Sequence, residues 1–317
     1  MYKFAVITGF LGAIKNRFLE YQRDRNLEDK LQIVKDIKGI NGVELCYPKD
    51  FEDVDKLKRI LNNYELEISA INFRARRNDR WLRGSFTSNK SKEREEVVKE
   101  FKQLIDIAKD MKVDKITTCP LNDGYDYLFE LDYVNAYKYL EDTFTEITEY
   151  DNNIKICIEY KLNGPRVRTI LGNVGETISF CKRINKNNIG VTLDFGHALL
   201  AKENPSQSLC LLEREKKLFY IHLNDNDFNW DWDLISGSYN FWQYIEFFYY
   251  LNRLNYRGYI SHDIFPKEFS SDKTFETSFK IERKLIEISK RLDDKRIKNN
   301  FIEKNPSIIF EYLYSLL

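Results

Sequence analysis

Short runs of aliphatic and β-branched residues alternate with longer amphipathic segments along most of the chain. Eight of the short runs have the length and apolar character of buried parallel strands: Lys3–Thr8, Gly42–Cys46, Glu67–Asn72, Lys115–Cys119, Lys155–Glu159, Gly190–Asp194, Phe219–Asn224 and Tyr259–Asp263. Helical patterns follow them at roughly 27–38, 51–63, 92–111, 130–149, 175–185, 206–215, 240–254 and 274–291. Strand then helix, repeated eight times, predicts an α/β fold in which a parallel sheet closes into a (β/α)8 TIM barrel. A doubly wound open sheet is the alternative, but no Gly-x-Gly-x-x-Gly motif follows the first strand.

No linker rich in Ser, Gly or Pro divides the chain, so we expect one catalytic barrel domain over residues 1–291. Residues 292–317 are expected to form a C-terminal helical extension of the same domain. An apolar stripe there would pack on the barrel or on a second subunit, and it comprises Phe301, Ile308, Ile309, Tyr312 and Leu316. The connection 73–91 is longer than a typical βα loop, which indicates a lid or a flap that contacts substrate.

Composition and charge exclude several classes of protein. Hydrophobic residues make up 43% of 317, which is enough for a full core. Fifty basic residues balance fifty acidic ones, and no basic block suggests a nucleic-acid partner. The first residues do not resemble a signal peptide, and no apolar run is long enough to span a bilayer, so no membrane partner is expected. The five cysteines are scattered without a C-x-x-C pair, which favours a reducing, cytoplasmic environment.

The last four predicted strands each end in a carboxylate or an imidazole: Glu159, Asp194, His222 and Asp263. Because the C-terminal ends of the strands of a TIM barrel meet at one face, we expect these side chains to converge. Three carboxylates and one imidazole suit Mn²⁺, Mg²⁺ or Co²⁺, and without a cation they would repel one another. For any one of them alone, a polar strand end that faces water is the stronger interpretation, but four at the same strand position favour a metal site.

Two further motifs point to a second cation. His197 follows Asp194 by three residues, and Asp231 and Asp233 form a D-x-D pair between two tryptophans. In an extended segment, this spacing places both carboxylates on one side. An Asx-rich turn is the alternative, and it suits Asp225 and Asp227 equally well.

With these motifs the chain resembles the xylose isomerase-like barrels, and among them most of all the L-rhamnose isomerase-type sugar isomerases. The resemblance covers residues 1–290 in architecture and is specific over about 156–264. It implies two divalent metals per chain, most simply Mn²⁺, with Co²⁺ or Mg²⁺ as alternatives. The first would be held by Glu159, Asp194, His222 and Asp263, and the second by His197, Asp231 and Asp233. The lysine of a Glu-x-Lys motif, here Lys161, would contact substrate, and a homo-oligomer (dimer or tetramer) is usual for such enzymes.

The expected function is therefore aldose–ketose isomerisation of a sugar by a metal-dependent intramolecular oxidoreductase. Glu159 and Asp263 are the candidates for the base, and Lys161 would hold a substrate oxygen and neutralise developing charge. A ketose 3-epimerase of the same fold is the main alternative. Such an enzyme uses one metal and a pair of glutamates, whereas this chain has the shorter Asp263 and a D-x-D pair. An abasic-site endonuclease would need a zinc cluster rich in histidine, and only three histidines are present. A non-catalytic sugar-binding protein would not need the full set of ligands.

Five arginines lie within ten residues of the connection 73–91, interleaved with Phe73 and Trp81: Arg74, Arg76, Arg77, Arg80 and Arg83. Such a cluster is able to clamp a phosphate, sulfonate or carboxylate, because guanidinium groups bind oxyanions with two hydrogen bonds. The alternative is a solvated loop whose arginines pair with surface acids. We expect Trp81, Arg83, Lys161 and His197 to contact substrate. His262 has no assigned role and should point to the other side of its strand.

Overall fold

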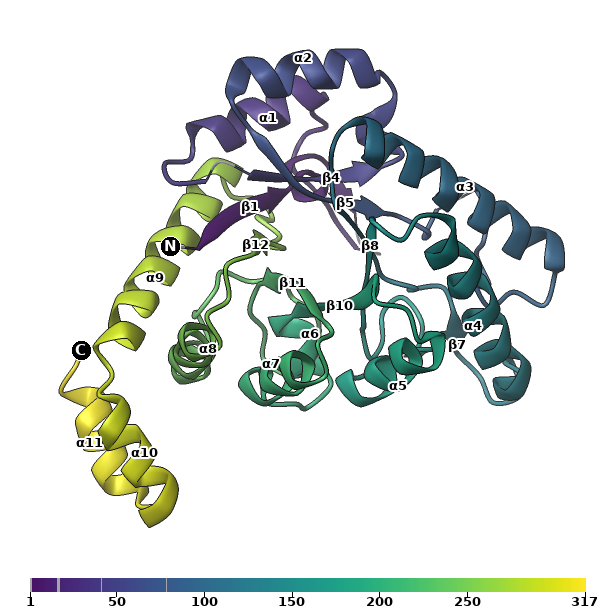
Figure 1. Ribbon diagram of the computed structural model, residues 1–317. Coiled ribbons are helices and arrows are strands. Elements are labelled where there is room, and N and C mark those ends of the chain that lie inside the picture. The colour runs from purple at the N-terminus through teal and green to yellow at the C-terminus, as the bar shows by residue number, and fades with distance from the viewer. Residues whose placement is uncertain (1, 16–17, 41, 78) are drawn as a thin grey trace.

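The computed structural model describes residues 2–15, 18–40, 42–77 and 79–317. Eight parallel strands form a closed barrel, in which β12 pairs with β1 to complete the ring, so the predicted fold class is confirmed (Figure 1). The barrel strands are β1 (Lys3–Ile7), β4 (Gly42–Tyr47), β5 (Glu67–Phe73), β6 (Lys115–Thr118), β8 (Lys155–Glu159), β10 (Ile189–Asp194), β11 (Leu218–Leu223) and β12 (Tyr259–His262). Their side chains are almost all buried, as expected for strands covered on both faces.

Helices surround the barrel at every predicted position. They are α1 (Leu27–Asp36), α2 (Val54–Tyr64), α3 (Ser91–Asp110), α4 (Tyr133–Tyr150), α5 (Val174–Ile184), α7 (Pro205–Arg214), α8 (Phe241–Arg253) and α9 (Ser271–Arg291). Several begin at an Asn or Asp whose side chain accepts a hydrogen bond from a backbone N–H of the first turn, as Asn26 does for α1 and Asp53 for α2. Their apolar faces pack on the strands in one continuous core.

Several short elements were not predicted, because they lack a long hydrophobic period. The most important is α6 (Phe195–Leu200), which starts directly at the end of β10. The others are the 3-10 turns η1 (Thr8–Leu11) and η2 (Lys49–Phe51) and two antiparallel pairs, β2 (Ile14–Lys15) with β3 (Glu20–Tyr21) and β7 (Gly124–Tyr125) with β9 (Arg168–Thr169).

The C-terminal extension is helical, as predicted, but it forms two helices instead of one. They are α10 (Asp294–Glu303) and α11 (Pro306–Tyr314), and the chain turns between them at Lys304, which has a positive φ of 51°. Figure 1 shows both helices beyond the end of α9, at the periphery of the barrel. The aromatic rings of α11 contact Trp242 of α8, with ring centroids 5.7 Å away for Phe310 and 5.1 Å for Tyr314.

In the part of the chain that the structure describes, no helix combines the length and the apolar character needed to cross a membrane.

Candidate metal centre

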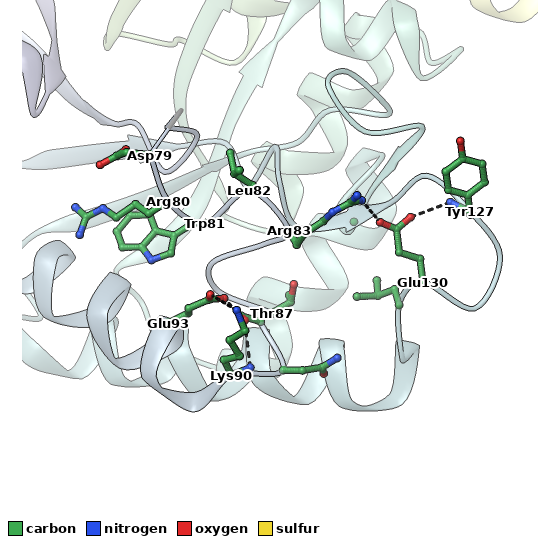
Figure 2. Close-up of a pocket in the computed structure, with 14 residues that line it drawn as sticks. Asp79, Arg80, Trp81, Leu82, Arg83, Thr87, Lys90, Glu93, Tyr127 and Glu130 are labelled. Atoms are coloured by element: carbon green, nitrogen blue, oxygen red, sulfur yellow. Dashed lines mark hydrogen bonds and ion pairs between the residues drawn. The ribbon is translucent and has the colours of Figure 1, made fainter.

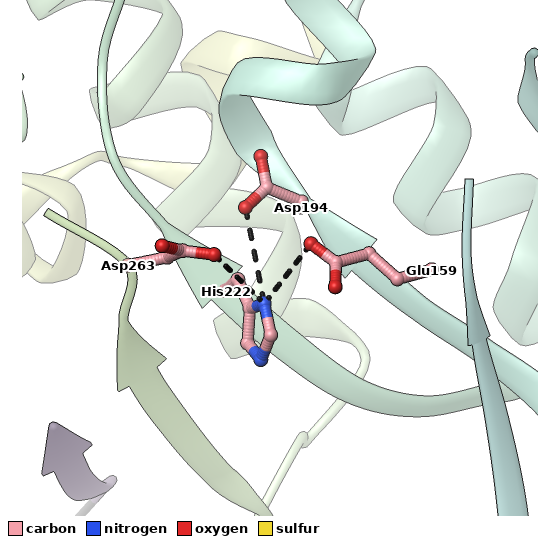
Figure 3. Close-up of side chains that lie close together, drawn as sticks. All are labelled: Glu159, Asp194, His222 and Asp263. Carbon is pink, nitrogen blue, oxygen red and sulfur yellow. Dashed lines mark hydrogen bonds and ion pairs between the residues drawn. The ribbon is translucent and has the colours of Figure 1, made fainter. Parts of the chain in front are cut away.

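The four predicted ligands of the first metal lie together at the C-terminal ends of consecutive barrel strands. Glu159 and Asp194 are the last residues of β8 and β10, His222 lies near the end of β11, and Asp263 directly follows β12. Each offers one donor atom, and the four atoms lie within 4.8 Å of one another (Figure 3). Among the described residues this is the one such group of His, Cys, Asp and Glu side chains, and all four are buried.

His222 Nδ1 is the meeting point of this group. It lies 3.3 Å from Glu159 Oε1, 3.6 Å from Asp263 Oδ2 and 3.9 Å from Asp194 Oδ2. Figure 3 shows the three carboxylates grouped around this nitrogen. The donor set is therefore three carboxylates and one imidazole nitrogen, which suits a hard divalent cation.

The electrostatics of the group also fit a cation. Burial would raise the pKa of Glu159, but His222, His197 and Arg74 hold it at about 2, so this carboxylate is charged. Burial raises the pKa of Asp263 to about 8, with further contributions from Glu159 and Asp194. Asp263 Oδ1 is buried and has no hydrogen-bond partner among the described residues. A divalent cation among these oxygens would offset their repulsion and give Asp263 a partner, so the residues present fit such an ion.

The orientation of His222 depends on Glu44, which sequence reasoning missed. Glu44 lies on β4 and its Oε2 is 2.9 Å from His222 Nε2, while its Oε1 accepts a hydrogen bond of 2.9 Å from Asn72. When Nε2 carries the proton, it donates to Glu44 and leaves the Nδ1 lone pair facing the carboxylates. The signal available in the sequence was a charged residue in the middle of the apolar run Gly42–Cys46.

Asp194 is held by two donors on neighbouring segments. Its Oδ1 accepts from the backbone N–H of His197 at 2.7 Å and thereby caps α6, and its Oδ2 accepts from Asn224 at 2.8 Å. Asn224 was not predicted as part of the site. It fits there because Gly196 has no side chain, since a Cβ at that position would lie 1.8 Å from Asn224 Oδ1.

The three residues predicted to hold a second metal lie beside the first group. His197 Nδ1 is 3.3 Å from Glu159 Oε1, and its Nε2 is 3.4 Å from Asp231 Oδ2. Asp231 also forms an ion pair with Lys161. Burial, followed by the charges of Asp231 and Asp263, raises the pKa of Asp233 well above its usual range. The structure thus brings together the two predicted sets of ligands and Lys161.

The model of the xylose isomerase-like TIM barrel family matches residues 31–285, which is most of the chain. The chain belongs to this family.

Solved structures of the same fold cover nearly the whole barrel. A D-tagatose 3-epimerase-like protein is 22% identical with a TM-score of 0.68, and the match covers 91% of this chain and 98% of that one. A xylose isomerase domain protein from Alicyclobacillus acidocaldarius has a TM-score of 0.70 at 12% identity, covering 92% and 100%. At these identities the likeness establishes the fold.

Two curated relatives match over shorter segments. An uncharacterized protein of Methanocaldococcus jannaschii is 29% identical over 185 residues, which are 51% of this chain and 61% of that protein. The xylose isomerase of Streptomyces lividans is 32% identical over 94 residues, or 29% of this chain and 24% of the relative. The matched segments thus span less than two thirds of either relative.

In this xylose isomerase-like barrel, the other predicted substrate contacts lie in the connection after β5. Trp81 is buried, with the guanidinium groups of Arg77 and Arg80 over its ring at 5.1 and 4.1 Å. Arg83 has 72% of its side chain exposed and pairs with Glu130. Figure 2 shows Arg80, Trp81 and Arg83 around a surface pocket that Lys90 and Glu93 also line. None of these partners is one of the four ligands, and a substrate role for Trp81 and Arg83 stays a prediction.

Other residues of the candidate motifs have structural contacts. Asp225 accepts hydrogen bonds from the backbone N–H groups of Tyr239 and Asn240, and Asp227 accepts one from that of Asn229. Asp227 therefore fits the alternative of an Asx-rich turn, because it binds the backbone two residues on, whereas Asp225 ties the start of this loop to the residues just before α8. His262 is buried on the outer side of β12, where Nε2 lies 2.7 Å from Glu282 Oε2 of α9, so its predicted direction is confirmed.

Proposed function

We propose that this chain is a divalent-metal-dependent sugar isomerase that interconverts an aldose and a ketose. The observation that carries the proposal is the convergence of Glu159, Asp194, His222 and Asp263 at the C-terminal mouth of the barrel. Active sites of TIM barrels are found at this face, and the family name and the epimerase-like neighbours of the same fold support a sugar as substrate.

The four side chains would hold Mn²⁺, or else Co²⁺ or Mg²⁺, through three carboxylates and the Nδ1 of His222. When bound, such an ion polarises a sugar carbonyl and orients the neighbouring hydroxyl. Glu44 keeps the imidazole in the tautomer that presents Nδ1, and Asn224 holds the Asp194 carboxylate in place.

Moving a hydrogen between two adjacent carbons also needs groups that take up and return protons. Glu159 and Asp263 flank the same point from opposite sides of His222 and are the candidates for the base. Lys161 is partly buried, and desolvation would lower its pKa, but Asp231 and Asp233 raise it above its usual range, so it carries a charge. Such an ammonium group stabilises negative charge that develops on a substrate oxygen.

We further propose that His197, Asp231 and Asp233 hold a second cation. In the described part of the chain, nothing forms a hydrogen bond with the buried atoms His197 Nδ1 and Asp231 Oδ1. Burial and then the negative charges of Asp231 and Asp263 raise the pKa of Asp233. A cation at this position would satisfy all three side chains.

One observation favours a second candidate function, the ketose 3-epimerase. Lys161 already pairs with Asp231, so this carboxylate has a positive partner without any second cation. A one-metal reaction needs only the first four ligands, and epimerisation inverts one carbon of a ketose without forming an aldose.

Metal counting and product analysis distinguish the two. Chelated protein should lose all turnover of free aldoses and ketoses, and Mn²⁺ or Co²⁺ should restore it. We expect two ions per chain by elemental analysis and an aldose–ketose pair by NMR. One ion per chain, with a C3-inverted ketose as the product, would establish the epimerase instead. Undiminished turnover in metal-free protein would exclude both.

A further inference from the structure

The five arginines that follow β5 fall into two groups by their partners. Arg77 and Arg80 both form ion pairs with Glu100 of α3, and Arg83 pairs with Glu130. For these three, the interpretation as arginines that pair with acids holds. Their charges are balanced within the protein.

Arg74 and Arg76 differ from the other three. They are separated by Ala75, which is 3% exposed and packs in the core, whereas Arg74 is half-buried and Arg76 is exposed. No described residue places a carboxylate within 4.0 Å of either guanidinium group, and none of the five residues outside the described ranges is acidic. The one polar side-chain contact of Arg74 is Cys46 Sγ, 3.7 Å from Nη2, and Arg76 has none among the described residues.

Both arginines directly follow the C-terminal end of β5, at the mouth of the barrel where the candidate metal centre lies. Arg74 Nη2 lies 3.2 Å from the position that a Cβ on Gly9 would take, beyond the end of β1. Burial would lower the pKa of Arg74, but Cys46, Asp263 and Glu159 raise it above its usual range, so the guanidinium lies within electrostatic reach of two ligands. Partial desolvation, followed by the charge of Arg74, lowers the pKa of Arg76, although its side chain is exposed to solvent. Two positive charges therefore repel each other here without an acidic partner in contact.

We propose that Arg74 and Arg76 form an oxyanion subsite, so that the substrate is a sugar that carries a phosphate or carboxylate group. The inference rests on the proposed function for the sugar part of the substrate. Guanidinium groups bind phosphate and carboxylate with paired hydrogen bonds, and Arg74 has further N–H donors beyond the one that faces Cys46. The carbonyl end of an open-chain sugar would then lie at the four ligands and its anionic end at the two arginines.

Binding of inorganic phosphate tests the subsite without any reference to catalysis. Full-length protein in Mg²⁺ buffer is titrated by calorimetry, and Arg76→Gln and Arg74→Gln are each expected to weaken phosphate binding about tenfold or more, as for a lost charge-assisted bond. Arg76 is exposed and its replacement should fold even if that of the half-buried Arg74 does not. Arg80→Gln is the matched control, since Arg80 lies in the same loop but pairs with Glu100. Equal phosphate affinity in wild type and Arg76→Gln would overturn the proposal.

Turnover then identifies the source of the anion. We expect kcat/KM for a sugar phosphate or a sugar acid to exceed that for the neutral sugar by about tenfold or more, and Arg76→Gln to remove that preference. The preferred anion shows whether the group is phosphate or carboxylate. Neutral sugars used as well as both acidic kinds would overturn the subsite but leave the isomerase intact. Phosphate binding that needs Arg76, in a protein that isomerises no sugar, would instead keep the subsite and refute the proposed function.

Discussion

A buried histidine–glutamate pair occurs at His222 and again at His262, and the two pairs have different roles in the barrel. Each imidazole is buried and lies against a glutamate, His222 against Glu44 at 2.9 Å and His262 against Glu282 at 2.7 Å. His222 also faces the carboxylates at the barrel mouth, whereas His262 Nδ1 lies 2.9 Å from the backbone oxygen of Ala5. The first pair orients a candidate ligand, and the second joins a strand to α9.

Glu44→Gln should therefore weaken metal binding specifically. The variant can no longer fix the His222 tautomer with a charged acceptor, and we expect affinity for Mn²⁺ to fall about 10- to 100-fold. Glu282→Gln is the matched control, because it alters an equally buried glutamate–histidine pair that touches no ligand. Titration of both variants with Mn²⁺, alongside thermal melting, checks this. Equal Mn²⁺ affinities for the two variants would contradict the role of Glu44.

The raised pKa of Asp263 predicts that the stability of the metal-free protein depends on pH. Its pKa is about 8 in the folded chain and about 4 when unfolded, so folding takes up a proton between these values. Stability from this group is complete below the lower pKa and is lost as pH rises through the upper one. With chelator present, the Tm of the wild type should fall as the pH rises from 6 to 9. At pH 9, Asp263→Asn should melt at least about 2–4 °C above wild type, which corresponds to about 1 kcal/mol in the free energy of unfolding.

The same substitution should abolish the stabilisation by Mn²⁺, because it removes a ligand. Thermal melts with and without the ion, across the same pH range, measure both effects. A chelated wild type whose Tm is flat from pH 6 to 9 would show that Asp263 does not bind a proton in the folded state.

At the level of elements, the candidate second site depends on two segments that follow barrel strands. The helix α6 begins directly after Asp194 and carries His197, and the loop after β11 carries Asp231 and Asp233. That loop is shaped by Asp225, which forms a bridge with Leu234 through their backbones. This short loop thus contains one aspartate that shapes it, Asp225, and two that face the candidate site, Asp231 and Asp233.

Asp231→Asn or Asp233→Asn should lower the metal content from two ions to one per chain. If the second site supports proton transfer, kcat should fall about 100-fold or more while KM changes less, since substrate still meets the first four ligands. Asp227→Asn is the control from the same loop, because its carboxylate accepts hydrogen bonds from Asn229 and Trp232 and belongs to neither candidate set of ligands. Rates indifferent to both substitutions, with one ion per chain throughout, would support the epimerase.

The whole molecule consists of a barrel and a peripheral pair of helices. The α11 helix has no buried residue, and apolar side chains such as Ile302 and Ile308 remain exposed at 81% and 56%. The links to the barrel include the rings against Trp242 and a hydrogen bond of 2.6 Å from Tyr249 to Asp294. Ile297 is the one buried residue in 293–317, so we expect the barrel core to depend little on this extension.

Deletion of residues 293–317 should leave Mn²⁺ binding unchanged and lower Tm by only about 2–4 °C, the scale of a few lost contacts. Circular dichroism melts and Mn²⁺ titration check this, and light scattering tests whether the extension contacts a second subunit. A full-length dimer that becomes monomeric on truncation would support that interpretation. A truncated chain that no longer binds Mn²⁺ would show that the extension supports the barrel.

Hydrophobic periodicity was sufficient to locate the eight strands and the surrounding helices, and the ends of the strands indicated the four residues of the candidate metal centre. The reason is physical: parallel strands end at one face of the barrel, so polar residues at their C-terminal ends must meet. Pairing across distant segments is not encoded in any local period. The contact of Glu44 with His222, the ion pair of Lys161 with Asp231, and the division of the loop arginines into paired and unpaired groups arise only when separate elements pack. The sequence alone therefore predicted which segments are buried, whereas the tertiary structure of the closed barrel determined which partner each buried charge has.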